Sequence, residues 1–286
     1  MCSSPWTRPG GGPVKCGQCM ECRLAYSREW AIRITHEAQM WDRNCFLTLT
    51  YDDTTLPRYG QLVKRDLQLF FKRLRKAGYK FRYVACGEYG EQKRRPHFHV
   101  ALFGVDFAED RIAYGFGVQN DQMYVSRSLS VIWGKSLFPM GHTIGSLTFE
   151  SAAYIARYIT KRVSGVGASP LPLHSDPVSG ELILPNPEFL LCSKGIGRGW
   201  FRDFFFADVF PHARVITSQG SPAPVPRYYK SLLRECGADL ALDMSYRTSV
   251  NMESNLDSRV REDMPARRHS RDILARARSG IVKRNI

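Results

Sequence analysis

Two apolar runs joined by one short connection constrain the fold most strongly. They are KFRYVACGEYG, residues 80–90, and HFHVALFGVDF, residues 97–107, and each has the length and composition of a strand. Only a polar, basic connection separates them. Parallel neighbours need a crossover of about a dozen residues or more, so a connection this short favours an antiparallel pair.

The surrounding pattern alternates helices and strands. Residues 45–52, CFLTLTYD, alternate apolar residues with threonines and indicate a strand, and residues 141–149 indicate another. The element order predicts an α+β fold with helices on one face of a mostly antiparallel sheet. Residues 108–148 are otherwise mixed, and the Pro-rich stretch 169–190 is expected to be an irregular loop or hairpin excursion. Helical spacing of apolar residues marks four segments: 27–40, 66–78, 151–163 and 199–210.

The charge of the chain points to a polyanionic partner. Lys and Arg number 41 against 27 Asp and Glu, a formal net charge of +14. Such a balance favours nucleic acid first, with a merely basic surface as the alternative. Residues 257–286 hold nine Lys and Arg against four acidic residues and are expected to form a charged, partly helical or mobile tail.

Several classes of protein are excluded by what the sequence lacks. No run approaches the roughly 18 apolar residues of a membrane span, and the N-terminus lacks the apolar region of a secretory signal. We therefore expect no membrane association and a cytosolic setting, where cysteines are reduced or bind metal. No GxxxxGK[ST] phosphate loop occurs, so no ATP site is expected.

Two histidines stand two residues apart in the second strand of the hairpin. His97 and His99 project from one face, while Phe98 turns to the other. Glu88 ends the preceding strand, where a hairpin would bring its carboxylate beside both imidazoles. Two imidazoles and a carboxylate with open positions suit Mg²⁺ or Mn²⁺, and the lack of thiolates argues against zinc. The alternative is a pair of ordinary core or surface histidines.

The helix expected at 151–163 carries a stripe of reactive side chains. Tyr154, Tyr158 and Lys161 follow at positions i, i+4 and i+7, so they lie on one side of the helix. A tyrosine oxygen can act as a covalent nucleophile, and two phenols one turn apart can face a single cleft. The spacing alone is weak evidence in a chain with 13 tyrosines, where packing is the ordinary explanation.

A cysteine motif lies close to the N-terminus. CGQCMEC places three cysteines with two residues between neighbours: Cys16, Cys19 and Cys22. A closed structural zinc site takes four ligands, so one more is needed. Cys2 is the nearest candidate, with His36 or Cys45 as rivals. The alternative is a set of ordinary reduced thiols.

Three motifs then follow one another in a diagnostic order: FLTLTYD (46–52), PHFHVALF (96–103) and AAYIARYITK (152–161). This order resembles the HUH endonuclease superfamily, in which two histidines flank a hydrophobic residue and a downstream helix carries the nucleophilic tyrosine. Together with CGQCMEC, SREWAIR, LVKRDLQLFFKRLRK, CGEYGE, GIGRGWF and PRYY, the set is similar to the rolling-circle replication initiators of gokushovirus-type single-stranded DNA phages (Microviridae). The match covers about residues 14–230.

The resemblance implies a fold and a set of roles. It implies a ferredoxin-like or RRM-like antiparallel sheet in an HUH endonuclease domain, preceded by a Cys-rich knuckle and followed by a C-terminal extension with a basic tail. The domains expected are 1–26, 27–215 and 216–286. Residue by residue, it implies metal ligands at His97, His99 and, less securely, Glu88, paired nucleophiles at Tyr154 and Tyr158, an assisting Lys161, and a structural metal at Cys2, Cys16, Cys19 and Cys22.

The activity implied is the nicking of single-stranded origin DNA. A tyrosine would form a 5′-phosphotyrosine adduct, and the displaced strand would later be rejoined into a circle. The expected partners are origin DNA and the host helicase and polymerase, in the cytoplasm of a bacterial host. Two alternatives stay open: an HUH two-tyrosine transposase or plasmid initiator, and a non-enzymatic nucleic-acid-binding protein with an RRM-like sheet and a zinc knuckle. The candidate DNA contacts are Arg94, Arg95, Arg157 and Arg162.

Overall fold

The computed structural model describes residues 2–7, 9–90, 94–117, 120–161, 173–175, 179–217, 220–253 and 264–284. Side chains are not described for residues 158–161, 174–175, 265 and 278–284. The chain forms two compact units, one of Met1–Glu37 with Gly197–Ile286 and one of Ala38–Ile196. The domain boundaries expected after residues 26 and 215 stay a prediction.

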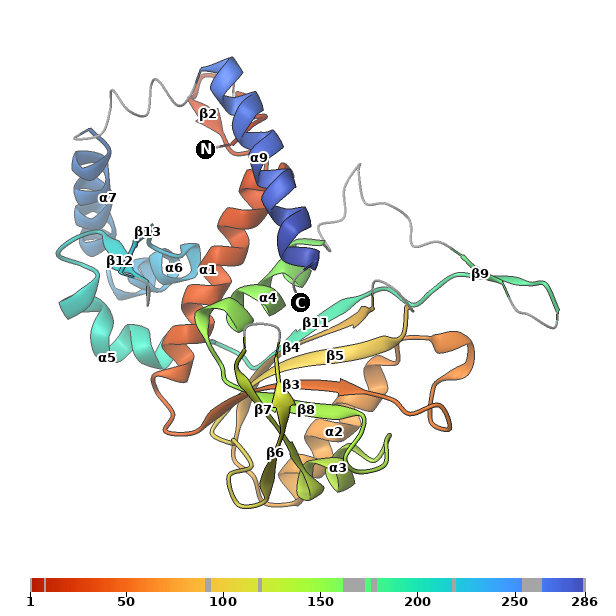
Figure 1. Ribbon diagram of the computed structural model, residues 1–286. Coiled ribbons are helices and arrows are strands. Elements are labelled where there is room, and N and C mark those ends of the chain that lie inside the picture. The colour runs from red at the N-terminus through yellow and green to blue at the C-terminus, as the bar shows by residue number, and fades with distance from the viewer. Residues whose placement is uncertain are drawn as a thin grey trace. The chain divides into compact units, whose positions relative to one another are not determined.

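The unit of Ala38–Ile196 is built on one antiparallel sheet (Figure 1). Seven strands pair in the order β11 (Phe189–Cys192), β4 (Arg82–Tyr89), β5 (Pro96–Phe103), β3 (Asn44–Thr50), β8 (His142–Gly145), β7 (Gln122–Ser126) and β6 (Arg111–Phe116). The expected hairpin is β4–β5, and β3 pairs antiparallel with both β5 and β8. The prediction of an α+β fold with an antiparallel sheet is therefore confirmed.

One face of this sheet carries the hydrophobic core. β5 contributes Phe98, Val100 and Leu102, which pack with α2 (Lys64–Lys76) and α3 (Arg127–Trp133). Trp133 lies edge-on to Phe98, with ring centroids 5.5 Å apart. Each of these large side chains stabilises the fold by about 1.5–3 kcal/mol on full burial. The helix α2 buries the four apolar residues of its helical stripe, Leu67, Phe70, Phe71 and Leu74.

The opposite face is covered by a different helix. α4 (Phe149–Lys161) contacts β4 and β5, and its Tyr154 reaches Glu88 on β4 (Figure 1). The prediction of helices on one face is therefore right for α2 and α3 and wrong for α4. The physical reason is that β5 is buried on both faces from Phe98 to Phe103, so both faces need cover.

Three strands of the sheet had no clear sequence signal. β6 and β7 lie in the stretch that reads as mixed, and β11 lies in the segment expected to be a loop or hairpin excursion. β11 approaches β4 closely at Gly87, where an added Cβ would lie 2.8 Å from the Phe189 ring. Two short strands, β9 (His174–Ser175) and β10 (Leu182–Ile183), form a separate hairpin, and one 3₁₀ turn spans Arg58–Gly60.

The other unit is mainly helical. Its helices are α1 (Met20–Ala38, the last residue outside the unit), α5 (Arg198–Asp208), α6 (Arg227–Cys236), α7 (Ala238–Glu253) and α9 (Pro265–Arg284). Its strand pairs are β1 (Trp6–Thr7) with β2 (Pro13–Val14), and β12 (Arg214–Ile216) with β13 (Pro222–Pro224). Helix α1 begins seven residues before its predicted start. Among the described helices, none combines the length and apolarity needed to cross a membrane.

A buried aromatic stack joins three helices of this unit. The His36 ring of α1 stacks on Trp200 of α5 at 3.6 Å between centroids, and its Nδ1 lies 2.9 Å from the Tyr229 hydroxyl of α6. Beside it, the Gly197 N–H donates to the Glu37 carboxylate at 2.7 Å. Gly197 has a φ of +81°, and a Cβ there would lie 2.6 Å from the Tyr229 oxygen. The GIGRGW motif therefore fastens α5 to its neighbours.

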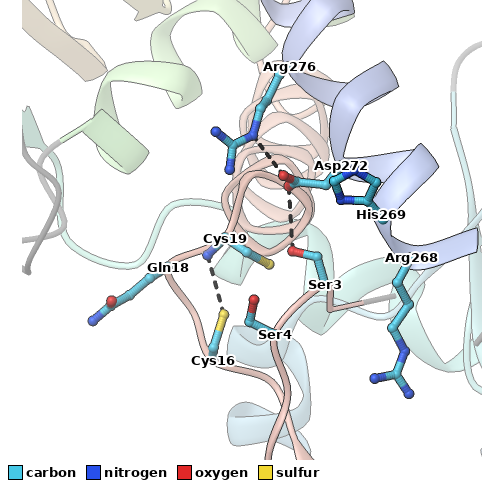
Figure 2. A pocket seen from close by; sticks show the side chains of 9 residues that line it. All are labelled: Ser3, Ser4, Cys16, Gln18, Cys19, Arg268, His269, Asp272 and Arg276. Carbon is cyan, nitrogen blue, oxygen red and sulfur yellow. Dashed lines mark hydrogen bonds and ion pairs between the residues drawn. The ribbon is translucent and has the colours of Figure 1, made fainter. Parts of the chain in front are cut away.

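Helix α9 is held against the N-terminal segment by polar contacts. Arg271 forms an ion pair with Glu21 of α1 at 3.2 Å. The Ser3 hydroxyl donates to Asp272 at 3.5 Å, and Asp272 also pairs with Arg276 at 2.7 Å (Figure 2). The basic C-terminal stretch is thus helical where it is described.

Candidate active site and cysteine cluster

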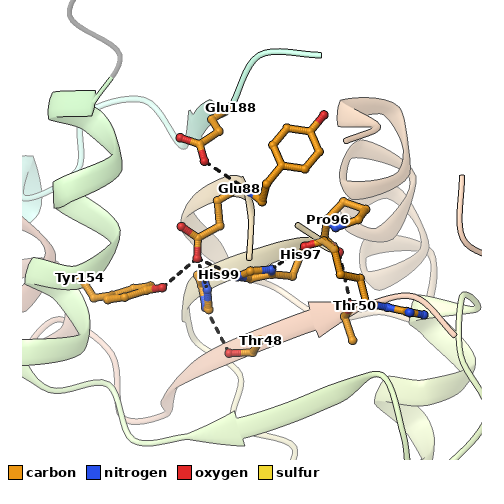
Figure 3. A network of polar contacts seen from close by, with 10 residues as sticks. Thr48, Thr50, Glu88, Pro96, His97, His99, Tyr154 and Glu188 are labelled. Carbon is orange, nitrogen blue, oxygen red and sulfur yellow. Dashed lines mark hydrogen bonds and ion pairs between the residues drawn. The ribbon is translucent and has the colours of Figure 1, made fainter. Parts of the chain in front are cut away.

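The β4–β5 hairpin brings one carboxylate and two imidazoles together. Glu88 lies directly across from His97 in the ladder, and His99 lies two residues further along β5. All three side chains point to the face opposite Phe98, and their nearest ligand atoms lie within 4.8 Å of one another (Figure 3). The short connection thus produces the juxtaposition that the sequence indicates. Their role as metal ligands stays a prediction.

One oxygen of Glu88 is the centre of the site. Its Oε1 lies 2.7 Å from His97 Nε2, 2.8 Å from His99 Nε2 and 2.7 Å from the Tyr154 hydroxyl. The residue is only 2% exposed. Its second oxygen, Oε2, is buried without a hydrogen-bond partner among the described residues. A buried carboxylate oxygen without a partner is costly unless another group binds it.

The far nitrogen of each imidazole is held by the protein. His97 Nδ1 lies 3.1 Å from the Arg95 carbonyl, which can only accept, so Nδ1 carries the proton. His99 Nδ1 lies 3.1 Å from the Thr48 hydroxyl. A carbonyl or hydroxyl on one nitrogen is how proteins orient a metal-binding histidine. In neutral His97 the Nε2 lone pair then faces a carboxylate oxygen, and a cation or an added proton is needed between them. The residues therefore fit a divalent cation.

The charges of the three groups agree with that fit. Burial alone would raise the pKa of the Glu88 carboxyl, but the hydrogen bonds and charge of His97 and His99 outweigh it and hold the pKa well below its usual range. Burial lowers the pKa of His99, which favours a neutral ring. Burial also lowers the pKa of His97, but its contact with Glu88 outweighs this and the net shift is upward. The site thus keeps a carboxylate ionised beside at least one neutral imidazole.

Strand β3 supplies two supporting side chains that sequence reasoning missed. Phe46 stacks on the His99 ring at 5.5 Å and meets the Tyr154 ring edge-on at 6.4 Å. Thr48 lies opposite His99 in the ladder and contacts its Nδ1. The alternation of FLTLT carried a signal for this: its buried leucines fill the core, so Phe46 and Thr48 must face the site.

Helix α4 delivers the tyrosine. Its N-terminus is capped reciprocally, because Ser151 N–H donates to the Thr148 hydroxyl at 3.2 Å and Thr148 N–H donates to the Ser151 hydroxyl at 2.8 Å. The Arg157 guanidinium lies over the Tyr154 ring, 5.3 Å from its centroid. The structure therefore brings Tyr154 to the site. The predictions for the side chains of Tyr158 and Lys161, and for Arg162, lie outside the described residues.

The arginines before β5 have contacts of their own. Arg95 donates to the Tyr51 carbonyl at 2.7 Å and pairs with Asp53 at 2.7 Å. Arg94 lies 5.7 Å from the centroid of the Tyr89 ring. Arg95 thus braces the start of β5 against the end of β3. A DNA-binding role for either arginine stays a prediction.

Four cysteines form a second group in the helical unit. Cys2, Cys16, Cys19 and Cys22 place their sulfurs within 4.8 Å of one another, and none is in a disulfide. The sulfurs of Cys2 and Cys19 are 3.8 Å apart, and zinc with bonds of about 2.3 Å to four sulfurs separates them by about 3.8 Å. The backbone N–H groups of Cys16 and Cys19 each donate to a cluster sulfur at 3.3 Å. The group fits a closed structural metal site.

Cys2 completes this group, and its two rivals lie elsewhere. His36 is part of the aromatic stack, and Cys45 is buried in the sheet core. Burial raises the pKa of Cys19, but hydrogen bonds from Ser3 and Cys22 outweigh it and lower the pKa to about 6. A thiol that ionises this readily suits metal binding, which requires thiolates.

Residues 44–163 match the family model of the replication-associated protein ORF2. The chain is also 30% identical over 260 residues to the replication-associated protein VP4 of Bdellovibrio phage phiMH2K, covering 87% of this chain and 76% of that protein. The chain belongs to this family of phage replication-associated proteins. Residues 44–163 include Glu88, His97, His99 and Tyr154.

Two further relatives support membership of this family and its Microviridae type. The chain is 35% identical over 204 residues to replication-associated protein ORF2 of Spiroplasma virus 4, which covers 66% of this chain. It is 30% identical over 245 residues to replication-associated protein ORF4 of Chlamydia phage 1, which covers 82% of this chain. The chain spans 57% of the length of each of these two relatives. No solved structure matches the chain.

Proposed function

We propose that this protein is an HUH-type replication initiator that nicks single-stranded DNA at a viral origin through a tyrosine nucleophile. One observation carries the proposal: the Tyr154 hydroxyl binds the same carboxylate oxygen that both histidines approach, at 2.7 Å. A nucleophile and a ligand set for a divalent cation therefore lie within one layer of hydrogen bonds. Mg²⁺ or Mn²⁺ bound by Glu88, His97 and His99 would polarise the scissile phosphate.

The chemical step is a transesterification. The Tyr154 oxygen attacks the phosphorus in line, and an O–P bond forms as the bond from phosphorus to the 3′ oxygen breaks. The phenol loses its proton, and the departing oxygen takes one up to become a 3′-OH. The product is a 5′-phosphotyrosine adduct, and the 3′-OH can prime synthesis. A carboxylate with a pKa as low as that of Glu88 is a weak base, so the phenol proton needs another acceptor.

Two further residues of α4 have proposed roles by sequence position. Tyr158 follows Tyr154 by one helical turn and would cleave the regenerated origin while Tyr154 still holds the first 5′ end. The new 3′-OH would then attack the first phosphotyrosine and close a single-stranded circle. Lys161 would either stabilise the phosphate or help deprotonate a phenol.

The topology of the sheet supports the proposed ferredoxin-like, HUH-type fold. β3, α2, β4, β5, α3 and β8 follow in that order, with the β6–β7 hairpin inserted before α3. In the sheet, β5 lies between β3 and β4, which α2 connects, so the unit contains a split βαβ arrangement. The face opposite α2 and α3 holds the histidines.

DNA binding follows from charge in this proposal. The arginines at 94, 95, 157 and 162 would contact the backbone of the origin strand, within a chain of formal charge +14. Unwinding and polymerisation would come from the host helicase and DNA polymerase, in the cytoplasm of a bacterial host. The names of the relatives, all replication-associated proteins of phages, support this setting.

The test is a covalent-adduct assay. The full chain is incubated with Mn²⁺ and a single-stranded origin oligonucleotide labelled at its 3′ end, and the label is followed on a denaturing protein gel. We expect a shifted protein band, and a free 5′ fragment ending in a 3′-OH that a polymerase can extend. Chelation by EDTA should abolish both products.

Variants then assign the roles. Tyr154→Phe with Tyr158→Phe should remove the adduct, and His97→Ala with His99→Ala should remove nicking. Tyr246→Phe, an exposed tyrosine on α7, is the matched control and should nick normally. An adduct that survives the double tyrosine change would overturn the proposal. DNA binding without any adduct in the unaltered protein would favour the non-enzymatic alternative.

A further inference from the structure

A polar cavity lies beside the cysteine cluster, within the helical unit (Figure 2). Its volume is about 480 Å³, and it opens between the N-terminal segment and α9. Besides cluster sulfurs, its lining includes Ser3, Ser4, Gln18, Arg268, His269 and Arg276. Hydroxyl, amide and guanidinium groups are donors that phosphate oxygens accept from.

The basic side chains around the cavity divide into two sets. Arg271 fastens α9, because it pairs with Glu21 and both side chains are largely buried, at 22% and 14% exposed. Arg268 and Arg276 instead line the cavity, eight residues apart on one side of the helix. The acidic side chain between them, Asp272, is already bound to Arg276 and Ser3. The cavity therefore carries a net positive charge.

We propose that this cavity binds backbone phosphates of single-stranded DNA, away from the nicking site. A polymer fits better than a single small anion, because α9 carries seven Arg and Lys against one Asp along Pro265–Arg284. A basic helix that continues beyond the cavity offers charge to successive phosphates. The inference rests on the proposed function in that single-stranded DNA is the substrate.

A purely structural explanation makes different predictions. Four thiolates around one zinc ion leave a net charge of about −2, and the nearby arginines could serve only to offset it. Arg276 fits that explanation poorly, since its side chain is 70% exposed. If charge compensation were the whole role, removing Arg268 and Arg276 would loosen the cluster and leave the salt dependence of DNA binding unchanged.

The experiment measures the affinity of the full chain for a fluorescent single strand of about 30 nucleotides without origin sequence, from low to high salt. The variant is Arg268→Ala/Arg276→Ala. The control is Arg198→Ala/Arg202→Ala on α5, which removes the same charge from the same unit at side chains that are 66% and 76% exposed. Two lost phosphate contacts should reduce the slope of log K against log salt by about 1.4. The control should change it far less.

A charge change of opposite sign strengthens the test. Asp272→Asn removes the carboxylate that occupies Arg276 and should tighten DNA binding at low salt. Equal slopes for the α9 variant and the α5 control would overturn the inference. So would a loss of zinc or of helical circular dichroism in the α9 variant that accounts for its weaker binding.

The outcome is separable from that of the proposed function. Tyr154→Phe/Tyr158→Phe should abolish the adduct and leave the salt slope unchanged. A chain that never forms an adduct but loses slope on Arg268→Ala/Arg276→Ala keeps the phosphate site and overturns the nicking proposal. The reverse result overturns the phosphate site alone.

Discussion

The chain builds two groups of potential metal ligands by opposite means. Glu88, His97 and His99 stand on neighbouring strands of a seven-stranded sheet, where the hydrogen-bond ladder fixes their positions before any ion binds. The cysteines come from a short turn, the first turn of α1 and Cys2, fourteen residues before Cys16. Few packed side chains hold that arrangement, so a bound metal must itself organise it.

Their chemistry differs in the same sense. Four thiolates close the coordination sphere of zinc and leave no position for a substrate. One carboxylate and two imidazoles leave positions open, and here a tyrosine hydroxyl lies on the shared oxygen. The comparison teaches that a preformed open site suits catalysis, whereas a closed site made of local chain suits folding. The predictions below test that division, from the largest effect to the smallest.

Loss of a cysteine ligand should have the largest effect, and it should be on folding. Cys16→Ser removes one thiolate, and binding of structural zinc to such short motifs contributes on the order of 10 kcal/mol. We expect loss of bound zinc and rapid proteolysis of the N-terminal segment, measured by metal analysis and limited trypsin digestion. Cys236→Ser, an exposed cysteine of the same unit, is the control. Full zinc retention in Cys16→Ser would contradict a closed four-thiolate site.

Loss of the central carboxylate should affect chemistry and leave the fold intact. Glu88→Gln keeps the shape of the side chain but removes the charge, so we expect single-turnover cleavage to fall about 1,000-fold and Mn²⁺ affinity to fall with it. Zinc content should not change. Glu188→Gln is the control, because that carboxylate accepts from the Tyr89 N–H and is outside the ligand group. Normal cleavage by Glu88→Gln would remove the distinction between the two regions.

A supporting residue should have an intermediate effect. Thr48→Val deletes the hydroxyl on His99 Nδ1, and loss of such a contact lowers metal affinity or activity by about 10–100-fold. Thr48→Ser should restore most of the cleavage rate, which a packing role for the residue would not predict. Thr143→Val changes the cross-strand neighbour on β8 and is the control. Mn²⁺ titrations of the cleavage rate separate affinity from turnover.

The sequence was sufficient where local rules determine geometry. The short connection between β4 and β5 sets an antiparallel pair, and the strand period then puts His97 and His99 on one face with Glu88 beside them. The cysteine spacing likewise pointed to Cys2 as the fourth member of its group. These inferences need no knowledge of distant contacts.

The sequence was insufficient where distant segments meet. The contact of Thr48 with His99 depends on how β3 pairs with β5, and nothing local specifies that register. β6 is exposed along almost its whole length, so it shows no alternation of apolar and polar residues. The early start of α1 was hidden because Met20–Cys22 belongs to the cysteine motif and has no helical periodicity.

The smallest effect should come from acid, through a histidine that has no place in either metal site. Burial lowers the pKa of His36 to about 3, against about 6.5 in an unfolded chain. Between these values the unfolded state binds a proton that the folded state does not. The stability is therefore complete above about pH 6.5 and falls as the pH drops, by about 2 kcal/mol at pH 5. Urea unfolding at pH 7 and pH 5 measures the difference.

A neutral replacement isolates this contribution. His36→Gln keeps a hydrogen-bonding group near the Tyr229 hydroxyl but cannot take up the proton, so its stability should change about 2 kcal/mol less between the two pH values. His212→Gln, an exposed histidine of the same unit, should behave like the unaltered protein. Acid should then weaken the unit that holds the cysteine cluster through its aromatic stack, even with the metal in place. An unchanged pH dependence in His36→Gln would assign the acid sensitivity to other groups, the cysteine thiolates first, and would make the cluster the determinant of stability in that unit.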